Sequence, residues 1–245
     1  RWVPYYEYFL PTLIKGSTAV VCISEFTRQE VLERYPKIQE EKLKVIHGGV
    51  DLERFHPCSP GVIKERYELN DYLLCVGEVR PYKNIENVFR ALELWSDGPQ
   101  LAISGKIFGD HKAKLENLAR SLNIENRVTW LGYVPDDLLP NLYSEAAAFI
   151  FPSLYEGFGL PILEAMACGC PTLSSNMASL PEIGGKAAHF FDPKEIDDMA
   201  EAIKKVCEDS VYRQKLAQGG PKHAKNFSWE SSTKKHMELF ETVLN

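Results

Sequence analysis

Short apolar runs alternate with longer amphipathic stretches along most of the 245-residue chain. Runs of four to six residues that are rich in Val, Ile, Leu, Phe and Ala are typical of strands buried on both faces of a sheet. Most of the runs are separated by a stretch long enough to form a helix. The pattern predicts strands at 19–24, 43–47, 72–77, 101–105, 128–131, 147–151, 171–174 and 188–191.

The stretches between the runs carry apolar residues at helical spacing. In one stretch, a single apolar face is formed by Ile85, Val88, Phe89, Leu92 and Trp95. A second stretch, at 196–207, repeats this pattern. Strands that alternate with helices predict an α/β fold, a doubly wound parallel sheet with helices on both faces. Such sheets bind ligands outside the carboxyl ends of their strands, so the loops after the strands are where chemistry is expected.

The two ends of the chain depart from this alternation. The segment after residue 192 has helical patterns only and closes with a helix to residue 245, which Ser228 can cap. Near the start, an aromatic helical stripe is formed by Trp2, Tyr5, Tyr6, Phe9 and Leu13. We expect this stripe to pack on the core of another domain, and a membrane interface is the alternative.

Charge and cysteine content narrow the range of partners. Lys and Arg number 28 against 34 Asp and Glu, and a net charge of −6 argues against a nucleic-acid surface while leaving room for a phosphate pocket. No run of the sequence approaches the ~18 apolar residues of a membrane span. Six cysteines without a Cys-x-x-Cys pair indicate free thiols in a reducing compartment, with no metal site. We therefore expect a cytoplasmic protein.

The loop after the run at 147–151 is the most informative segment for chemistry. It reads Pro-Ser-Leu-Tyr-Glu-Gly-Phe-Gly-Leu-Pro-Ile-Leu-Glu over residues 152–164. Pro161 is typical of the first position of a helix, so the turn at 157–160 is expected to offer free N–H groups at a helix N-terminus, which suits an anion. Glu156 precedes this turn, and Glu164 falls in the expected first helical turn. Carboxylates accept hydrogen bonds from sugar or ribose hydroxyls, so the two glutamates suit a sugar ligand. The alternative is a simple strand–turn–helix corner with a capping Glu, which accounts for the same sequence.

Three further loops follow predicted strands. After 72–77 come Gly77, Arg80, Lys83 and Asn84, where the two cations can clamp a diphosphate and Asn84 can cap the next helix. Solvated surface charge is the alternative for that segment alone. The other two corners contain Gly105 with Lys106, and Gly132 with Val134. Together the four loops at one sheet edge indicate a nucleoside diphosphate ligand.

These segments resemble the family 4 retaining glycosyltransferases of the GT-B fold. Glu156 to Glu164 matches the Glu-x7-Glu signature of that family, and the similarity continues through 165–171 and Leu-Pro-Glu at 180–182. Residues 45–51 and 55–57 resemble the family's entry into its nucleotide-binding domain. The sequences around Lys106 and of the Arg-Pro-Tyr-Lys-Asn segment are most similar to those of bacterial mannosyltransferases.

The resemblance implies a role for each candidate residue. Glu156 and Lys83 are the expected catalytic residues, with Glu156 binding the hydroxyls of the donor sugar and Lys83 binding the diphosphate. Glu164 is expected to bind the ribose, and the loop at 132–134 to border the base. The remaining expected donor-binding residues are Gly157, Phe158, Gly159, Leu160, Arg80, Gly77, Gly105, Lys106 and Val134. The family usually has an Arg where this chain has Glu78, so either Arg80 supplies the second charge or Lys83 and the helix terminus act without it.

The implied activity is the retaining transfer of a hexose, best mannose from GDP-mannose with a UDP-sugar as the alternative, to a glycan or lipid-linked glycan. No metal or other cofactor is expected. The implied domains are the truncated end of an acceptor domain at 1–40, the donor-binding domain at 41–226 and a crossing helix at 227–245. Peripheral contact with the inner face of a membrane would come from the acceptor domain.

Two other function classes stay open at this point. A nucleotide-sugar binding module without catalysis would carry the same loops. Another GT-B enzyme, such as a sugar-nucleotide epimerase, is a third hypothesis, which the context of the Glu-x7-Glu signature disfavours.

Overall fold

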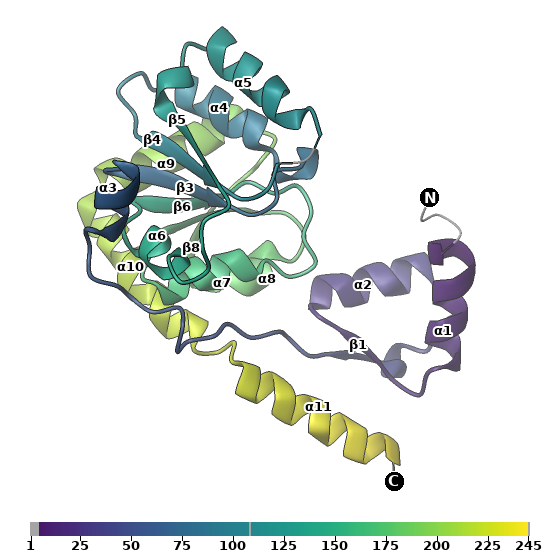
Figure 1. The fold of residues 1–245 in the computed structure, drawn as a ribbon. Helices are drawn as coiled ribbons and strands as arrows, with labels where there is room; N and C mark the ends of the chain where they lie inside the picture. The colour runs from purple at the N-terminus through teal and green to yellow at the C-terminus, as the bar shows by residue number, and fades with distance from the viewer. Residues whose placement is uncertain (1–4, 108, 245) are drawn as a thin grey trace.

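Six parallel strands form the central sheet of the protein. The computed structural model describes residues 5–107 and 109–244 (Figure 1). The strand order is β5-β4-β3-β6-β7-β8, and every neighbouring pair is parallel. The strands are β3 (Tyr72–Val76), β4 (Gln100–Ser104), β5 (Val128–Gly132), β6 (Ala148–Phe151), β7 (Thr172–Ser175) and β8 (Ala188–Phe191).

The chain reverses its direction of travel across the sheet between β3 and β6. From β3 it proceeds outward through β4 to β5, and from β6 it proceeds the opposite way through β7 to β8. In open α/β sheets, ligands bind in the crevice at such a switch point. The loops that follow β3 and β6, which hold Lys83 and Glu156, therefore flank the expected ligand position.

Alternation of side chains along the strands explains why helices cover both faces. Leu73 and Ile103 point into one apolar cluster, whereas Leu74 and Phe149 point into the other. The first face is covered by α4 (Ile85–Glu93), α5 (His111–Ser121) and α9 (Ile196–Glu208). The second is covered by α3 (Val62–Tyr67), α6 (Leu139–Ser144), α7 (Leu160–Ala167) and α8 (Leu180–Gly184).

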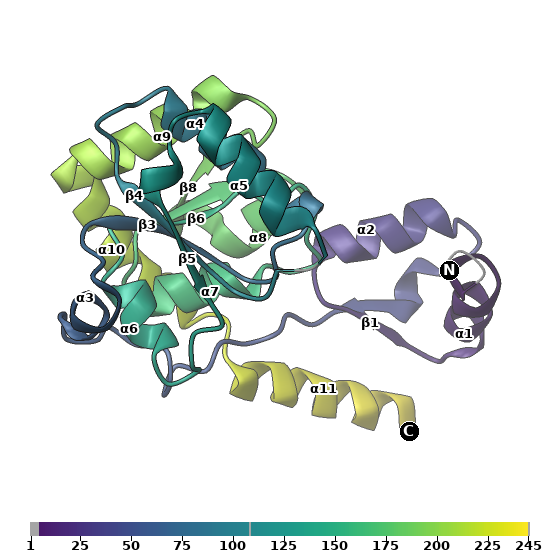
Figure 2. The same cartoon turned by 45° about the horizontal axis from the view of Figure 1, so that its top comes forward.

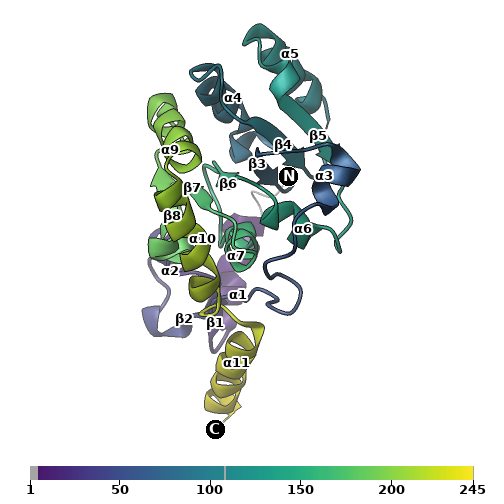
Figure 3. The ribbon, with the colours of Figure 1, turned by 90° about the vertical axis from the view of Figure 1, so that its left-hand side faces the viewer.

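Helix α10 (Ser210–Ala224) joins the two layers at the edge of the sheet. Figure 3 shows it running with α9 along the β8 side, and its residues enter both clusters, Leu216 one and Ala224 the other. The expected doubly wound α/β fold is thus confirmed. Each of the eight strands predicted from the apolar runs is present, with ends that lie within two residues of the predicted ones.

Residues 5–45 form a smaller unit beside the main sheet (Figure 2). A π-helical turn at Tyr5–Phe9 leads into α1 (Leu10–Gly16), followed by β1 (Val20–Cys22), α2 (Glu25–Arg34) and β2 (Leu43–Val45). Strands β1 and β2 pair in parallel with each other and not with the six-stranded sheet. The division of the chain at residues 40 and 226 stays a prediction, and β2 is a strand of the small unit.

The last helix, α11 (Trp229–Leu244), extends away from the six-stranded sheet on the side of the small unit (Figures 1 and 2). The N–H of Ser231 donates to Ser228 Oγ at 3.1 Å, which confirms Ser228 as its cap. Two distant segments of the chain meet at the start of α11, where the N–H of Val50 donates to the carbonyl of Phe227 at 2.8 Å. Asn245 lies outside the described residues. Four single turns of 3₁₀ helix complete the structure, at Glu40–Lys42, Pro81–Lys83, Glu125–Arg127 and Gly185–Ala187.

The aromatic stripe near the start is only partly visible. Trp2 and the side chains of Tyr5 and Tyr6 lie outside the described part of the chain. Phe9 and Leu13 are 64% and 57% exposed, so they do not pack on the rest of the described chain. Their expected burial against another domain stays a prediction. Between residues 5 and 244, leaving out 108, no helix is both long and apolar enough to cross a bilayer.

Candidate active site at the switch point

Three glycines bring the ends of β3, β4 and β5 into close contact. Gly77 donates its N–H to the carbonyl of Ser104 at 2.9 Å, and Gly105 donates to that of Gly132 at 2.7 Å. All three glycines have positive φ, and Gly105, at +137°, passes directly over the Gly77 carbonyl. A Cβ on Gly105 would lie 1.9 Å from that oxygen, so only glycine fits there. The glycines thus form a tightly packed floor for this edge of the sheet.

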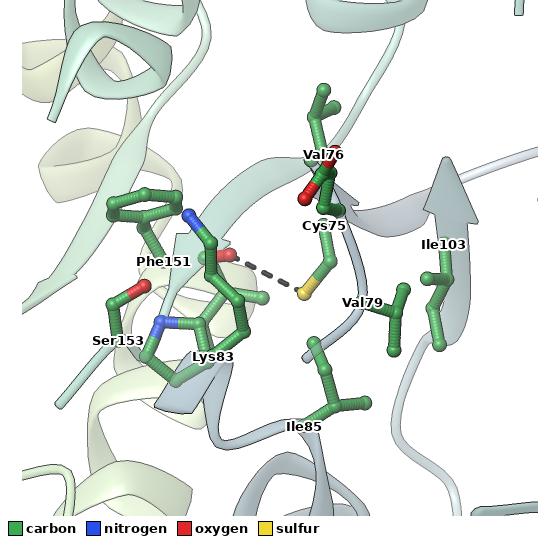
Figure 4. Close-up of a pocket in the computed structure, with 12 residues that line it drawn as sticks. Cys75, Val76, Val79, Lys83, Ile85, Ile103, Phe151 and Ser153 are labelled. Carbon is green, nitrogen blue, oxygen red and sulfur yellow. Dashed lines mark hydrogen bonds between the residues drawn. The ribbon is translucent and has the colours of Figure 1, made fainter. Parts of the chain in front are cut away.

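Lys83 and Glu156, the two expected catalytic residues, form an ion pair above this floor. Lys83 ends the 3₁₀ turn after β3, Glu156 lies in the loop after β6, and their Nζ and Oε1 atoms are 2.6 Å apart. Their side chains are only 13% and 16% exposed. The Lys83 ammonium also lies 4.5 Å from the centroid of the Phe151 ring (Figure 4). Since desolvation strengthens charge-assisted hydrogen bonds, this pair fixes both groups at the switch point.

Backbone and amide hydrogen bonds hold the two loops together. Leu154 donates its N–H to the carbonyl of Tyr82 at 2.8 Å. The Asn84 side-chain amide donates to the carbonyls of Pro152 and Pro193 at 3.3 and 2.8 Å. Asn84 was expected to cap α4, and this was wrong, because its side chain makes no capping bond. Its backbone is left-handed, with φ of 57°, which turns the amide toward the β6 loop instead.

A cavity lies between these loops and the end of β3. Lys83, Phe151, Ser153 and Cys75 are among its lining residues (Figure 4). Ser153 is fully buried, and its hydroxyl has no hydrogen-bond partner within the part of the chain that the structure describes. A buried polar atom without a partner is uncommon in folded proteins, so this hydroxyl is a distinctive feature of the cavity wall beside Lys83.

The glycine turn after Glu156 leads into α7 as expected, although the helix begins one residue early. Gly159 has φ of +99° and precedes the first helical residue, Leu160, so Pro161 is the second residue of the helix. The expectation that Glu164 lies in the first turn was wrong, because Glu164 is the fifth helical residue. The first turn carries no acidic residue, so no carboxylate of its own competes with an anion at the N-terminus of α7.

Glu164 is separated from Glu156 by its own hydrogen-bond partner. The Tyr143 hydroxyl, from α6, donates to Glu164 Oε2 at 2.9 Å. Burial raises the pKa of Glu164, and the hydrogen bond from Tyr143 and the charge of Arg54 oppose this effect. The two glutamates of the signature therefore occupy different surroundings, one in an ion pair and one against a buried phenol.

The raised pKa of Glu164 predicts a stability effect with a definite sign. An acid whose pKa is higher in the folded state stabilises the fold while it is protonated, and this stability is lost as pH rises from its unfolded pKa through its folded pKa. We therefore expect Glu164→Gln, which stays neutral and can still accept from Tyr143, to melt at a higher temperature than wild type at pH 8. The difference should shrink as pH falls toward 5. A lower melting temperature at pH 8 would contradict the assigned cause.

Three expected donor-binding residues lie away from the ion pair. Arg80 donates through Nε to Glu78 Oε2 at 2.9 Å on an exposed part of the loop, so it bonds to the residue where the chain departs from the family pattern. Lys106 is exposed. Val134 is buried in the core, so only its backbone can border a ligand. The structure brings together Lys83, Glu156, Gly77, Gly105 and the turn formed by Gly157, Phe158, Gly159 and Leu160.

The sequence analysis assigned no role to four residues that contact this turn. Ser24 and Thr27 of the small unit donate to the carbonyl of Gly157, and Ser179 lies within hydrogen-bond distance of the carbonyls of Glu156 and Phe158. His47 packs its ring beside Phe158. A lone hydroxyl such as that of Ser24 gives no sign in the sequence of a partner 133 residues away.

Comparison with known families identifies the group to which this site belongs. The model of the family described as "Glycosyl transferases group 1" matches residues 63–223. The chain belongs to the glycosyl transferases group 1 family. A second model, described as "Glycosyltransferase Family 4", matches residues 1–54. The group 1 match covers the six-stranded sheet and the loops that carry Lys83, Glu156 and Glu164.

Relatives and solved structures agree with this family and fold. O-antigen chain mannosyltransferase B of Escherichia coli is 33% identical over 248 residues, which are 98% of this chain and 65% of that protein. The chain thus spans less than two thirds of this relative. Sucrose-phosphate synthase from Thermosynechococcus elongatus superposes with a TM-score of 0.83 at 24% identity, over 96% of this chain and 60% of that one. Anabaena HepE, solved with UDP and glucose, superposes with a TM-score of 0.87 at 21% identity, over 97% of this chain and 66% of that one.

Proposed function

We propose that this chain binds a nucleoside diphosphate sugar and takes part in the transfer of its hexosyl group, with retention, to an acceptor hydroxyl. The observation that carries the proposal is the Lys83–Glu156 ion pair, 2.6 Å long and largely buried, beside the glycine turn at the N-terminus of α7. This arrangement puts a cation, a carboxylate and open N–H groups at one switch point. Those groups match the diphosphate and the sugar hydroxyls of such a donor.

The proposed reaction follows from where charge develops. The bond between the anomeric carbon and the phosphate oxygen breaks, and its electron pair stays on the leaving diphosphate. The acceptor oxygen bonds to the same face of that carbon, and its proton passes to the departing phosphate oxygen. Lys83 and the N–H groups of residues 157–160 stabilise the negative charge on the diphosphate. Glu156 holds the sugar by its hydroxyls, and Glu164 accepts a hydrogen bond from the ribose.

The donor sugar is proposed from the named relative. Mannose transfer by the Escherichia coli protein, 33% identical, supports GDP-mannose as the first donor to test. HepE was solved with UDP and glucose, which supports a UDP-sugar as the second. The named relative is a transferase, and this supports a transferase over a sugar-nucleotide epimerase or a binding module without catalysis.

The acceptor and the setting are proposed on the same basis. An O-antigen relative supports a glycan or lipid-linked glycan as the acceptor. We propose that residues 1–40 and the helix after residue 226 belong to the acceptor side, with residues 41–226 as the donor side. A cytoplasmic location, with peripheral membrane contact through the acceptor side, completes the proposal.

Glu156→Ala tests the proposed sugar contact. We expect transfer from GDP-mannose to fall by about ten- to hundred-fold, because the variant loses hydrogen bonds to a charged group that are each worth roughly 1.5–3 kcal/mol. The measurement is the initial rate of transfer by the protein that contains this chain, with thermal melting to confirm folding.

Glu201→Ala is the matched control, since Glu201 is exposed on α9, away from the carboxyl ends of the strands. The control should keep the wild-type rate. A wild-type rate in folded Glu156→Ala would remove Glu156 from the proposed site. Absence of binding by wild type to both GDP-mannose and UDP-glucose would overturn the proposed function as a whole.

A further inference from the structure

Hydroxyl groups contact three consecutive carbonyls in the turn that precedes α7. The Ser24 hydroxyl donates to the carbonyl of Gly157 at 2.7 Å, and the Thr27 hydroxyl lies 3.3 Å from the same oxygen. The Ser179 hydroxyl lies 2.9 Å from the carbonyl of Glu156 and 3.0 Å from that of Phe158. Every carbonyl from 156 to 158 therefore lies within hydrogen-bond distance of a hydroxyl, with the single proton of Ser179 shared between two of them, and the hydroxyls come from two different parts of the chain.

These contacts fix the direction of the neighbouring N–H groups. In a planar trans peptide the C=O and the following N–H point in opposite directions. A carbonyl of Gly157 held toward Ser24 thus turns the N–H of Phe158 away from α2. The N–H groups of Gly157, Phe158 and Gly159 donate to no other atom within residues 5–107 and 109–244. The contacts to the carbonyls thus leave these N–H groups without a competing partner in the described part of the chain.

The small unit is itself held in place against this turn. Ser24 is fully buried and caps α2, accepting from the N–H of Thr27 at 3.0 Å while it donates to Gly157. The Glu182 carboxylate, from α8, accepts from the N–H groups of Glu25 and Phe26 at 2.8 and 3.2 Å. Its Oε1 atom also lies 2.6 Å from His47 Nε2. The first turn of α2 is therefore anchored to α8 while its two hydroxyls contact the turn.

We propose that Ser24 and Thr27 are positioning residues for donor binding, so that the N-terminal unit completes the diphosphate-binding turn of the other lobe. This inference rests on the proposed function. Neither hydroxyl needs to touch the donor, because each acts through the carbonyl of Gly157. Losing them frees the Gly157–Phe158 peptide to rotate, and the ligand then has to order that peptide when it binds.

Titration of GDP and UDP against the chain measures the effect. We expect Thr27→Val to weaken the binding of whichever nucleotide binds wild type by about threefold, and Ser24→Ala combined with Thr27→Val by about tenfold or more. Thr27→Ser keeps the hydroxyl and should restore the wild-type dissociation constant. Thr27→Val removes one donor without removing the cap at Ser24, so it tests the inference even if the double variant does not fold.

Ser228→Ala is the control for loss of a helix cap alone. Ser228 caps α11 and makes no hydrogen bond to the turn. It should lower the melting temperature without changing the dissociation constant. The inference is overturned if Thr27→Val and the double variant bind as wild type does, or if Thr27→Ser fails to restore binding. If wild type binds neither nucleotide, the proposed function fails first and the inference falls with it.

Discussion

Replacing Lys83 by methionine should slow glycosyl transfer by roughly 10²- to 10³-fold, the cost of removing one fixed group that stabilises charge in a transition state. The side chain of Lys83 is only 13% exposed, and it lines the cavity at the end of β3. Water cannot replace it easily in that position. Methionine keeps an unbranched apolar side chain that is one heavy atom shorter, so the main loss is the ammonium, together with its contact to the Phe151 ring.

The measurement is kcat and KM for the donor in the protein that contains this chain. Charge that develops on the leaving diphosphate predicts a larger fall in kcat than rise in KM. Lys204→Met, on the exposed side of α9, is the matched control and should behave as wild type. Equal rates for Lys83→Met and Lys204→Met would show that Lys83 does not contact the diphosphate.

The same variant has a consequence for stability. Without the Lys83 ammonium, the Glu156 carboxylate, whose side chain is 16% exposed, loses the ion-pair partner that lies 2.6 Å away. Removing one member of a buried pair costs more than removing both, because the remaining charge is left desolvated. We expect Lys83→Met to lower the melting temperature and the double variant Lys83→Met, Glu156→Gln to regain part of it. Activity should stay lost in both, which separates the role in folding from the role in transfer.

The strands and the sheet edge were predictable from the sequence because both follow from local pattern. Apolar runs such as Tyr72–Val76 and Ala148–Phe151 mark buried strands by composition and length. A parallel sheet then places the ends of those strands together whatever their order. Lys83 and Glu156 could be assigned to one edge on this basis alone, although they are 73 residues apart in the chain.

The pairing of particular side chains was not predictable by the same argument. Asn84 has a side chain that suits a helix cap, and only its left-handed backbone turns it toward Pro152 and Pro193. Ser24 reaches a carbonyl 133 residues away, which no local spacing encodes. Glu164 finds Tyr143 through the packing of α6 on α7. These contacts depend on how the helices and strands pack once they have formed. They define the site more closely than the sequence motifs do.

The other large expected effect is structural, at the floor of the site. Gly105→Ala should destabilise the fold by more than about 4 kcal/mol, the range in which a single substitution leaves a fold of marginal stability largely unfolded. The added Cβ would lie 1.9 Å from the Gly77 carbonyl oxygen, and that oxygen belongs to rigid backbone that cannot step aside. The measurement is the free energy of unfolding from urea titration.

Gly61→Ala separates the steric clash from the backbone strain. Gly61 has φ of +122°, close to the +137° of Gly105, but a Cβ there would meet nothing within 4 Å. Gly61→Ala should therefore lower the free energy of unfolding only by the strain of a left-handed backbone at alanine, about 1–2 kcal/mol. If the two variants lose the same stability, the close approach of β3 and β4 does not hold Gly105 in place. A much larger loss at Gly105 would show that the floor under Lys83 and Glu156 tolerates no side chain, because two backbones meet there in direct contact.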